Sequence, residues 1–283
     1  KIFSAAAFFE DRDLPMSTTF DAREPIKIGG FTINDYHAQK RVMTIPEVFM
    51  HSSNIGTAMM AQAIGGDNLR KFYSDLGLLE PMEFGIREVA RPQVPNPWRE
   101  ISTMTASYGH GVTTTPLQLV AGVSSVINGG TLVKPKLVLS DEPDNAPEIR
   151  ILSEKNSHKM RQLLRIVVSE GTGSKAAVNG YKVGGKTGTA EKIDNGRYDN
   201  KKKISSFVGV FPMDAPKYAV YIMVDEPIGN KRTWGYATGG WVAAPAVART
   251  IAAIAAIEGI APEYEGGQDF ASSLKQYISA EED

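Results

Sequence analysis

Lys186-Thr187-Gly188-Thr189 (K-T-G-T) is the most informative stretch of this chain of 283 residues. It lies in a run from Tyr181 to Ile193 that is predicted to form a β-strand. Gly188 has no Cβ, so the backbone of a ligand can lie against the strand at that position. Lys186 supplies a positive charge, and the hydroxyls of Thr187 and Thr189 can bind a carboxylate. Taken alone, the tetrapeptide is equally compatible with an ordinary structural strand.

A second polar cluster, Ser52-Ser53-Asn54 (S-S-N), interrupts the helical pattern of residues 44–64. Ser and Asn favour local hydrogen bonds over a helix interior, so the helix is expected to break there, and such breaks are usually structural. A third feature is Lys1, which precedes an alanine-rich apolar run and is predicted to begin a buried helix. The conjunction of these three features, rather than any one of them, favours a functional site.

The overall composition is that of an ordinary globular domain, with 42% hydrophobic and 22% charged residues. A net charge of −1 gives no electrostatic footprint for nucleic acid. The absence of cysteine excludes disulfides and thiolate metal sites. The most apolar stretch, residues 241–257, contains Pro245 and Arg249 and is interpreted as a buried helix, so no membrane span is expected. The histidines lack metal-ligand spacing, so no metal or cofactor is expected: His37, His51, His110 and His158.

Hydrophobic periodicity predicts helices with recognisable ends. Thr115-Pro116 is predicted to open one helix, with Pro116 at the first helical position. Asp67 and Ser153 are predicted to cap two others. The segment 80–98 is rich in proline and is expected to be irregular. The remaining predicted helices cover residues 1–9, 44–64 with the break described above, and 241–257.

Short turns and strands make up the rest of the predicted structure. Gly29-Gly30 is expected at the tip of a surface hairpin within residues 17–36. Lys201-Lys202-Lys203 is interpreted as a solvated turn, and the residues after Gly259 as a frayed tail. The apolar run Tyr218–Val224 has the character of a central strand. Three main strands are predicted, over residues 181–193, 204–211 and 218–224.

The three polar features match the signatures S-x-x-K, S-x-N and K-T-G of penicillin-interacting serine acyl transferases. Lys1 would be the end of the first signature, with its serine three residues upstream and outside this sequence. The chain resembles the transpeptidase domain of class B penicillin-binding proteins, in particular the division-specific (FtsI-like) type of Gram-negative bacteria. Further matching segments are Ile28-Gly29-Gly30, Asp35-Tyr36-His37, residues 107–111, residues 115–119, Gly171-Thr172-Gly173, Phe207-Val208-Gly209 and residues 224–227.

The resemblance implies a fold as well as an activity. The expected fold is α/β (α+β), of the penicillin-binding transpeptidase and serine β-lactamase type, with an antiparallel-rich central sheet flanked by helices. Residues 1–263 are expected to form the transpeptidase domain, and residues 264–283 a polar C-terminal tail. In the family the first strands of the sheet precede the serine helix, so these strands are expected to be missing from this chain. Tyr218–Val224 would then have an unpaired edge.

The resemblance also implies a role for each polar residue in peptidoglycan D,D-transpeptidation. The upstream serine would attack the penultimate D-Ala carbonyl of a stem pentapeptide, with Lys1 as the general base. Burial and the nearby charge of Lys186 would lower the pKa of Lys1. Ser52 would relay a proton, and Asn54 would bind the amide of the acyl donor. Lys1, Ser52, Asn54 and Lys186 are expected to converge on one cleft, with Thr189 lining its far wall. The terminal carboxylate would be bound by Lys186, Thr187 and Thr189, and Gly188 would let the donor's backbone lie along the strand.

Other implications of the resemblance concern location and partners. The intact protein would be anchored in the inner membrane, with its catalytic domain in the periplasm, and would act in septal cell-wall synthesis. Its partners would be the stem pentapeptide, β-lactam antibiotics, a glycosyltransferase and division proteins. A serine β-lactamase is an alternative, although the glutamate with a nearby asparagine that class A enzymes need is not found between Asn54 and Lys186. A non-catalytic β-lactam sensor or structural module is a second alternative.

Overall fold

The computed structural model describes residues 1–138, 147–194, 197–264 and 269–279. The chain divides into two compact units. Unit 1 comprises residues Lys1–Val48 and Ser53–Met160, and unit 2 comprises Phe49–Ser52 and Arg161–Asp283. The S-S-N turn is therefore one of the places where the chain passes from one unit to the other.

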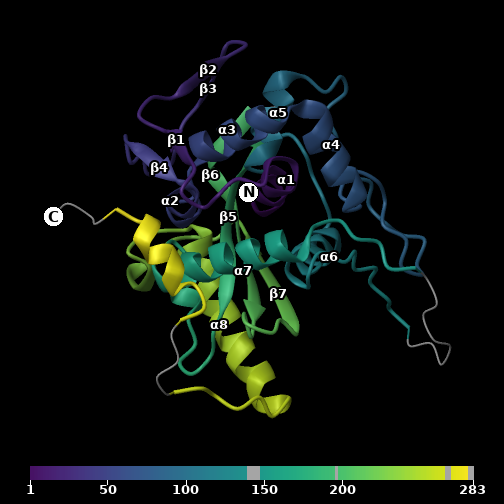
Figure 1. Ribbon diagram of the computed structural model, residues 1–283, viewed down its shortest axis with the longest axis vertical. Helices are drawn as coiled ribbons and strands as arrows, with labels where there is room; N and C mark the ends of the chain where they lie inside the picture. Colours follow the sequence, from purple (N-terminus) through teal and green to yellow (C-terminus); the bar gives the residue numbers. More distant parts are fainter. Residues whose placement is uncertain (139–146, 195–196, 265–268, 280–283) are drawn as a thin grey trace. The chain divides into compact units, whose positions relative to one another are not determined.

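Unit 1 is mainly helical and is built around α1 (Ile2–Arg12), which contacts α3, α4 and α6 (Figure 1). The alanine-rich face of α1 allows close packing, and Ala5, Ala6 and Phe9 are fully buried. The one buried hydroxyl of α1, on Ser4, lies 2.8 Å from Tyr73 Oη and donates to a backbone carbonyl. The other helices of this unit are α3 (Asn54–Ile64), α4 (Gly66–Asp75), α5 (Glu100–Ser107) and α6 (Pro116–Ile127).

Unit 1 also contains two small antiparallel sheets of two strands each. β1 (Thr19–Asp21) pairs with β4 (Val42–Thr44). β2 (Ile26–Ile28) pairs with β3 (Phe31–Ile33), and the predicted turn at Gly29-Gly30 joins them with positive φ angles of 54° and 80°. Ile33 is buried against α3 and α5 residues Ala58 and Met104. This contact anchors the end of β3 and the loop that follows it.

The predicted break at the S-S-N turn is confirmed. α2 (Ile45–Met50) ends before it, and α3 begins at Asn54. Ser53 is the N-cap of α3, and its Oγ accepts a hydrogen bond from the Gly56 N–H at 2.9 Å. A Cβ on Gly56 would lie 2.5 Å from a methyl carbon of Val48, so a residue without a side chain is needed for this close approach.

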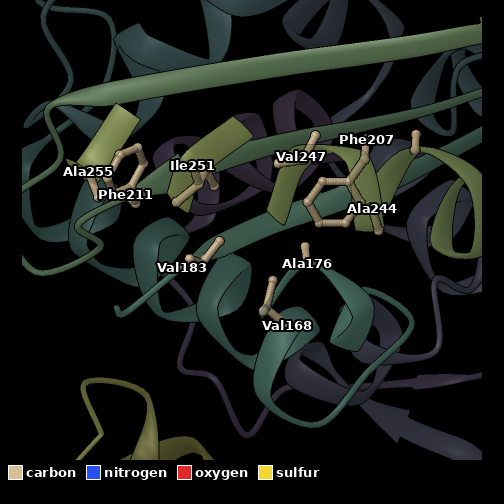
Figure 2. Packing of buried hydrophobic residues seen from close by; sticks show 10 residues of the cluster. Val168, Ala176, Val183, Phe207, Phe211, Ala244, Val247, Ile251 and Ala255 are labelled. Atoms are coloured by element: carbon tan, nitrogen blue, oxygen red, sulfur yellow. The ribbon is translucent and has the colours of Figure 1, made fainter. Parts of the chain in front are cut away.

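Unit 2 contains a three-stranded antiparallel sheet in the order β5-β6-β7. Its strands are β5 (Gly184–Asp194), β6 (Arg197–Phe211) and β7 (Tyr218–Asp225). α8 (Gly239–Ile257) packs against this sheet and contributes Ala244, Val247, Ile251 and Ala255 to the core shown in Figure 2. The sheet contributes Phe207 and Phe211, both fully buried. The position of K-T-G-T on β5 is thus fixed by a well-packed core.

The buried-helix interpretation of residues 241–257 agrees with this packing. α8 is long and apolar enough to cross a membrane by length and composition, but a core helix can pass the same test. Its buried positions recur along one face, at Gly239, Ala243, Val247 and Ile251. We therefore treat α8 as the helix that covers the sheet.

Most observed helix boundaries agree with those predicted from the sequence. Thr115 caps α6 and accepts from the Gln118 N–H at 3.2 Å, with Pro116 next to it. Ser153 precedes α7 (Glu154–Ser169), and its Oγ accepts from the Asn156 N–H at 3.3 Å. The predicted cap at Asp67 is wrong. Gly65 occupies the N-cap position of α4, and Asp67 lies in the first turn, where its negative charge still suits the helix dipole.

Two further expectations are corrected and one is supported. Lys201-Lys202-Lys203 lies in β6, because that strand begins already at Arg197. β7 has the apolar character of a central strand but pairs with β6 alone in the described part of the chain, which agrees with the expected unpaired edge. The described residues 269–279 are not frayed, since Leu274 is buried within the short helix η3 (Ser272–Tyr277) and Asp269 forms an ion pair of 2.6 Å with Arg165. The burial of Leu274 and the ion pair between Asp269 and Arg165 hold this segment in place, although its composition is polar.

Candidate active site

Ser52 has an unusual backbone conformation. Its φ angle is +58°, in the left-handed region that non-glycine residues rarely occupy. The turn is held by a hydrogen bond from the Ser52 N–H to the Phe49 carbonyl at 3.1 Å. Residues in this conformation cost free energy and often occur at functional sites. Ser52 is the residue of the S-S-N turn that belongs to unit 2, and its backbone conformation makes it a candidate functional residue.

In unit 2, Lys186 connects the K-T-G-T strand to this serine. Its Nζ donates to Ser52 Oγ at 2.8 Å and to Thr187 Oγ1 at 3.1 Å. Only 5% of Lys186 is exposed. A buried lysine is costly unless its donors are satisfied, and here hydroxyl groups serve that purpose. Lys186 is therefore held rigidly, with its charge directed at two hydroxyls that can exchange protons.

Thr172 extends this hydroxyl network. Its Oγ1 lies 3.3 Å from Thr187 Oγ1, and its N–H donates to the Met50 carbonyl at 3.3 Å. Sequence reasoning noted Gly171-Thr172-Gly173 as a family-like segment but gave Thr172 no role. Only the fold reveals that this threonine lies beside the K-T-G-T strand, because the two segments are separate in sequence.

The N-terminus of α8 meets the same strand. The Gly239 N–H donates to Thr189 Oγ1 at 3.0 Å. A Cβ on Gly239 would overlap backbone atoms of Gly188 and Ser206, so the helix can reach the strand only because residue 239 has no side chain. The N-terminus of a helix carries a partial positive charge. Together with Lys186, it makes this strand a favourable place for a carboxylate.

In unit 1, Lys1 and Asn54 form the second group of candidate residues. Lys1 Nζ donates to Asn54 Oδ1 at 2.6 Å. Burial lowers the pKa of Lys1 to about 8, and the negative charge of Asp35 partly opposes this effect. The downward direction agrees with the expectation from sequence. A free amine is thus accessible near neutral pH, as a general base requires.

The structure therefore distributes the predicted residues between the two units. Lys1 and Asn54 belong to unit 1, whereas Ser52 and the four K-T-G-T residues belong to unit 2. Ser52 and Asn54 are separated in the chain by Ser53 alone. Within the residues that the structure describes, His, Asp and Glu side chains form no group of three or more that can hold a metal ion.

Comparison with known proteins gives one consistent result. The family model for the penicillin binding protein transpeptidase domain matches residues 1–252. A probable peptidoglycan D,D-transpeptidase FtsI of Caulobacter vibrioides is 43% identical over 270 residues, which cover 92% of this chain and 46% of that protein. The chain thus spans less than half the length of this curated relative.

Solved structures share the fold. The transpeptidase domain of Burkholderia pseudomallei penicillin-binding protein 3 is 29% identical, with a TM-score of 0.83 and coverage of 93% of this chain and 78% of that one. Penicillin-binding protein 3 of Mycobacterium tuberculosis in complex with ampicillin is 27% identical, with a TM-score of 0.85 and coverage of 95% and 63%. These similarities confirm the expected fold class.

Proposed function

Because the chain belongs to the penicillin-binding protein transpeptidase family, we propose that its protein is a serine-type peptidoglycan D,D-transpeptidase of the division-specific kind. The observation that carries the proposal is the Lys186–Ser52 hydrogen bond on the K-T-G-T strand. The low pKa of Lys1 supports it independently, because this residue stands at the lysine position of the family's S-x-x-K motif. The nucleophile of the full-length protein would then be a serine three residues before Lys1.

The proposed reaction is acyl transfer in two steps. The Lys1 amine takes the proton of the serine hydroxyl, and the serine oxygen attacks the penultimate D-Ala carbonyl of a stem pentapeptide. The carbon–nitrogen bond to the terminal D-Ala then breaks, and the leaving amine receives a proton relayed through Ser52. An amine of a second stem peptide attacks the resulting ester, forms the cross-link and releases the serine. Each step conserves protons without a cofactor.

Binding of the acyl donor is assigned to the polar groups described above. Asn54 would bind the donor's amide through its side chain. The terminal carboxylate would lie against Lys186, Thr187 and Thr189, where positive charge and hydroxyl donors meet the N-terminus of α8. Gly188 would let the donor's backbone approach β5. We propose that both groups of residues, from unit 1 and unit 2, serve this single reaction.

β-Lactams are the proposed inhibitors, since the related Mycobacterium tuberculosis protein has been solved with ampicillin and with aztreonam. We also propose that the intact protein is anchored in the inner membrane, with this domain in the periplasm. A glycosyltransferase and division proteins would be its partners. These proposals follow from family membership and from the FtsI-like relative.

Labelling with a fluorescent penicillin tests the proposed function. The full-length protein should become covalently labelled and lose the label slowly. Lys186→Ala should reduce the labelling rate by about 100-fold or more, the effect expected for loss of a proton-relay group. Lys192→Ala is the matched control on the same strand, because Lys192 pairs with Asp225 and Glu226 instead. It should label like the wild type.

The outcomes also separate the alternatives. Release of the label within seconds would indicate a serine β-lactamase. Rapid, stable labelling without cross-linking of a stem-peptide donor to an acceptor amine would indicate a β-lactam sensor. Equal losses in the two lysine variants would contradict the role of Lys186.

A further inference from the structure

The loop after β3 holds the S-S-N turn through two consecutive residues. The Asp35 carboxylate accepts hydrogen bonds from Ser53 Oγ at 2.7 Å, from the Ile55 N–H at 3.0 Å and from the Asn54 N–H. The backbone carbonyl of Asn34 accepts a hydrogen bond from Asn54 Nδ2 at 2.8 Å. Four groups of the turn and of the first residues of α3 are therefore bound to one dipeptide.

These contacts determine how the Asn54 side chain is oriented. The Asn34 carbonyl can only accept a hydrogen bond, and a lysine ammonium can only donate one. The Asn54 amide must therefore point its nitrogen at Asn34 and its oxygen at Lys1, as observed. The amide nitrogen has two N–H donors, so the second can bind the amide of an acyl donor.

Helix capping alone does not require an acid at position 35. Ser53 is already the N-cap of α3 and accepts from the Gly56 N–H. A neutral acceptor could bind the N–H groups of Asn54 and Ile55 equally well. A carboxylate adds a negative charge, which interacts favourably with the dipole of α3. The same charge raises the pKa of the Lys1 amine and so opposes the effect of burial.

We propose that Asp35 is a positioning residue for acyl transfer, which fixes the S-S-N turn so that Asn54 presents its amide oxygen to Lys1, and which supplies a compensating negative charge to the Lys1 amine. This inference rests on the proposed role of Lys1 as the general base. It assigns to Asp35 two separable tasks, one of geometry and one of charge.

Among the described residues of unit 1, the helices that contact α1 bring few ionisable side chains to it. α1 packs against α3, α4 and α6. The sequences of α3 and α6 contain no ionisable side chain. From α4, Tyr73 contacts α1 at Ser4, and burial raises the pKa of Tyr73 to about 12, which keeps it neutral. The other ionisable residues of α4 are all exposed: Asp67, Arg70, Lys71 and Asp75.

Asp35→Asn separates charge from geometry in the full-length protein. The asparagine oxygen can still accept the backbone N–H bonds of α3, and its amide nitrogen can donate to Ser53 Oγ in place of the bond that the carboxylate accepts, whereas the negative charge is lost. Two quantities should be measured between about pH 6 and pH 10, the range in which Lys1 titrates. One is the rate of acylation by a fluorescent penicillin, and the other is the titration of the Lys1 amine followed by NMR of protein labelled with ¹³C-lysine.

The expected result is a shift in both titrations. Loss of the charge of Asp35 should move the Lys1 titration and the acid limb of the rate profile to lower pH by roughly one unit. Asp35→Ala, which removes the hydrogen bonds as well, should also lower the limiting rate at high pH, by about tenfold or more.

Two controls distinguish this role from ordinary stabilisation. Asp21→Asn removes a carboxylate of the same unit that pairs with Arg23, and should leave both titrations unchanged. Thr115→Ala removes the cap of α6 and should lower the melting temperature without moving either titration.

The inference is overturned if Asp35→Asn lowers the melting temperature but keeps the wild-type rate profile and Lys1 titration, because Asp35 would then be a helix cap only. The NMR measurement does not depend on activity. A wild-type protein that resists penicillin would therefore count against the proposed function, while the Lys1 titration would still decide the inference about Asp35.

Discussion

The Lys186 ammonium and the Ser52 hydroxyl lie 2.8 Å apart although 134 positions separate them in the sequence. Ser52 adopts a positive φ angle in this turn, and Lys186 is almost completely buried in a strand. Both conditions cost free energy. A pair of residues that each carry such a cost, and that meet at a hydrogen bond, is better explained by chemistry than by stability.

Ser52→Gly should therefore separate stability from activity. Glycine adopts positive φ without strain, so the free energy of unfolding of Ser52→Gly should exceed that of Ser52→Ala, which loses the same hydroxyl, by about 0.5–1 kcal/mol. Loss of the hydroxyl should reduce acylation by about 100-fold. Chemical denaturation and penicillin labelling measure the two effects. Ser52→Ala is the control, because it also loses the hydroxyl but keeps the strain. Equal stability of the two variants would show that the turn is not strained.

Acylation should depend on pH through Lys1. The pKa of this residue is lowered to about 8, and only the free amine can accept the serine proton. The rate should rise with pH through about 8 and then level off. A rate that does not change between about pH 6 and pH 9 would exclude Lys1 as the base.

The same group should also make folding stability pH-dependent. Between about 8 and the unperturbed value of 10.5, the unfolded chain binds a proton at Lys1 that the folded chain has lost. The free energy of unfolding contributed by Lys1 therefore increases as pH rises through this window. Denaturation of the wild type and of Lys1→Met at several pH values would reveal this contribution as the difference between the two curves.

Thr172 should support binding at the K-T-G-T strand. Thr172→Val keeps the shape of the side chain but removes the hydroxyl that lies beside Thr187, and should slow acylation by roughly tenfold. Thr172→Ser should retain most of the rate. Thr250→Val is the control, since the Thr250 hydroxyl bonds to its own helix at Ala246. If the two valine variants behave alike, Thr172 has no special role.

The core of unit 2 should be sensitive to truncation at Phe207. This residue is fully buried between β6 and α8 (Figure 2), so Phe207→Ala should lower the free energy of unfolding by about 3–5 kcal/mol. Ile257→Ala, at a position with 81% exposure in α8, should change it by less than about 0.5 kcal/mol. A mild effect at Phe207 would contradict the packing described here.

The sequence predicted those features that depend on local pattern. The helix break at Ser53 and the cap at Thr115 follow from side chains that bond to their own backbone. The prediction for Asp67 failed because α4 begins earlier, with Gly65 at the N-cap position. The prediction for Lys201-Lys202-Lys203 failed because pairing with β5 extends β6 back to Arg197. Local propensity could not reveal either effect.

The residues that contact the motif residues of the candidate site were harder to predict from the sequence. Lys1 and Lys186 stood out because each lies in a segment that matches a family signature, S-x-x-K for Lys1 and K-T-G for Lys186. Thr172 and Asp35 did not, since each acts on a segment far from it in the chain, and a threonine or aspartate in a loop is unremarkable. Their contacts with Thr187 and Ser53 appear only when the fold is known.

The most direct test of the central claim is peptide mapping by mass spectrometry of the full-length protein after reaction with penicillin. The account predicts a single stable adduct, on a serine three residues before Lys1, that forms rapidly in the wild type and slowly in Ser52→Ala and Lys186→Ala. An adduct on any other residue, or an adduct that forms at the wild-type rate in both variants, would contradict the proposal that these residues carry out acyl transfer.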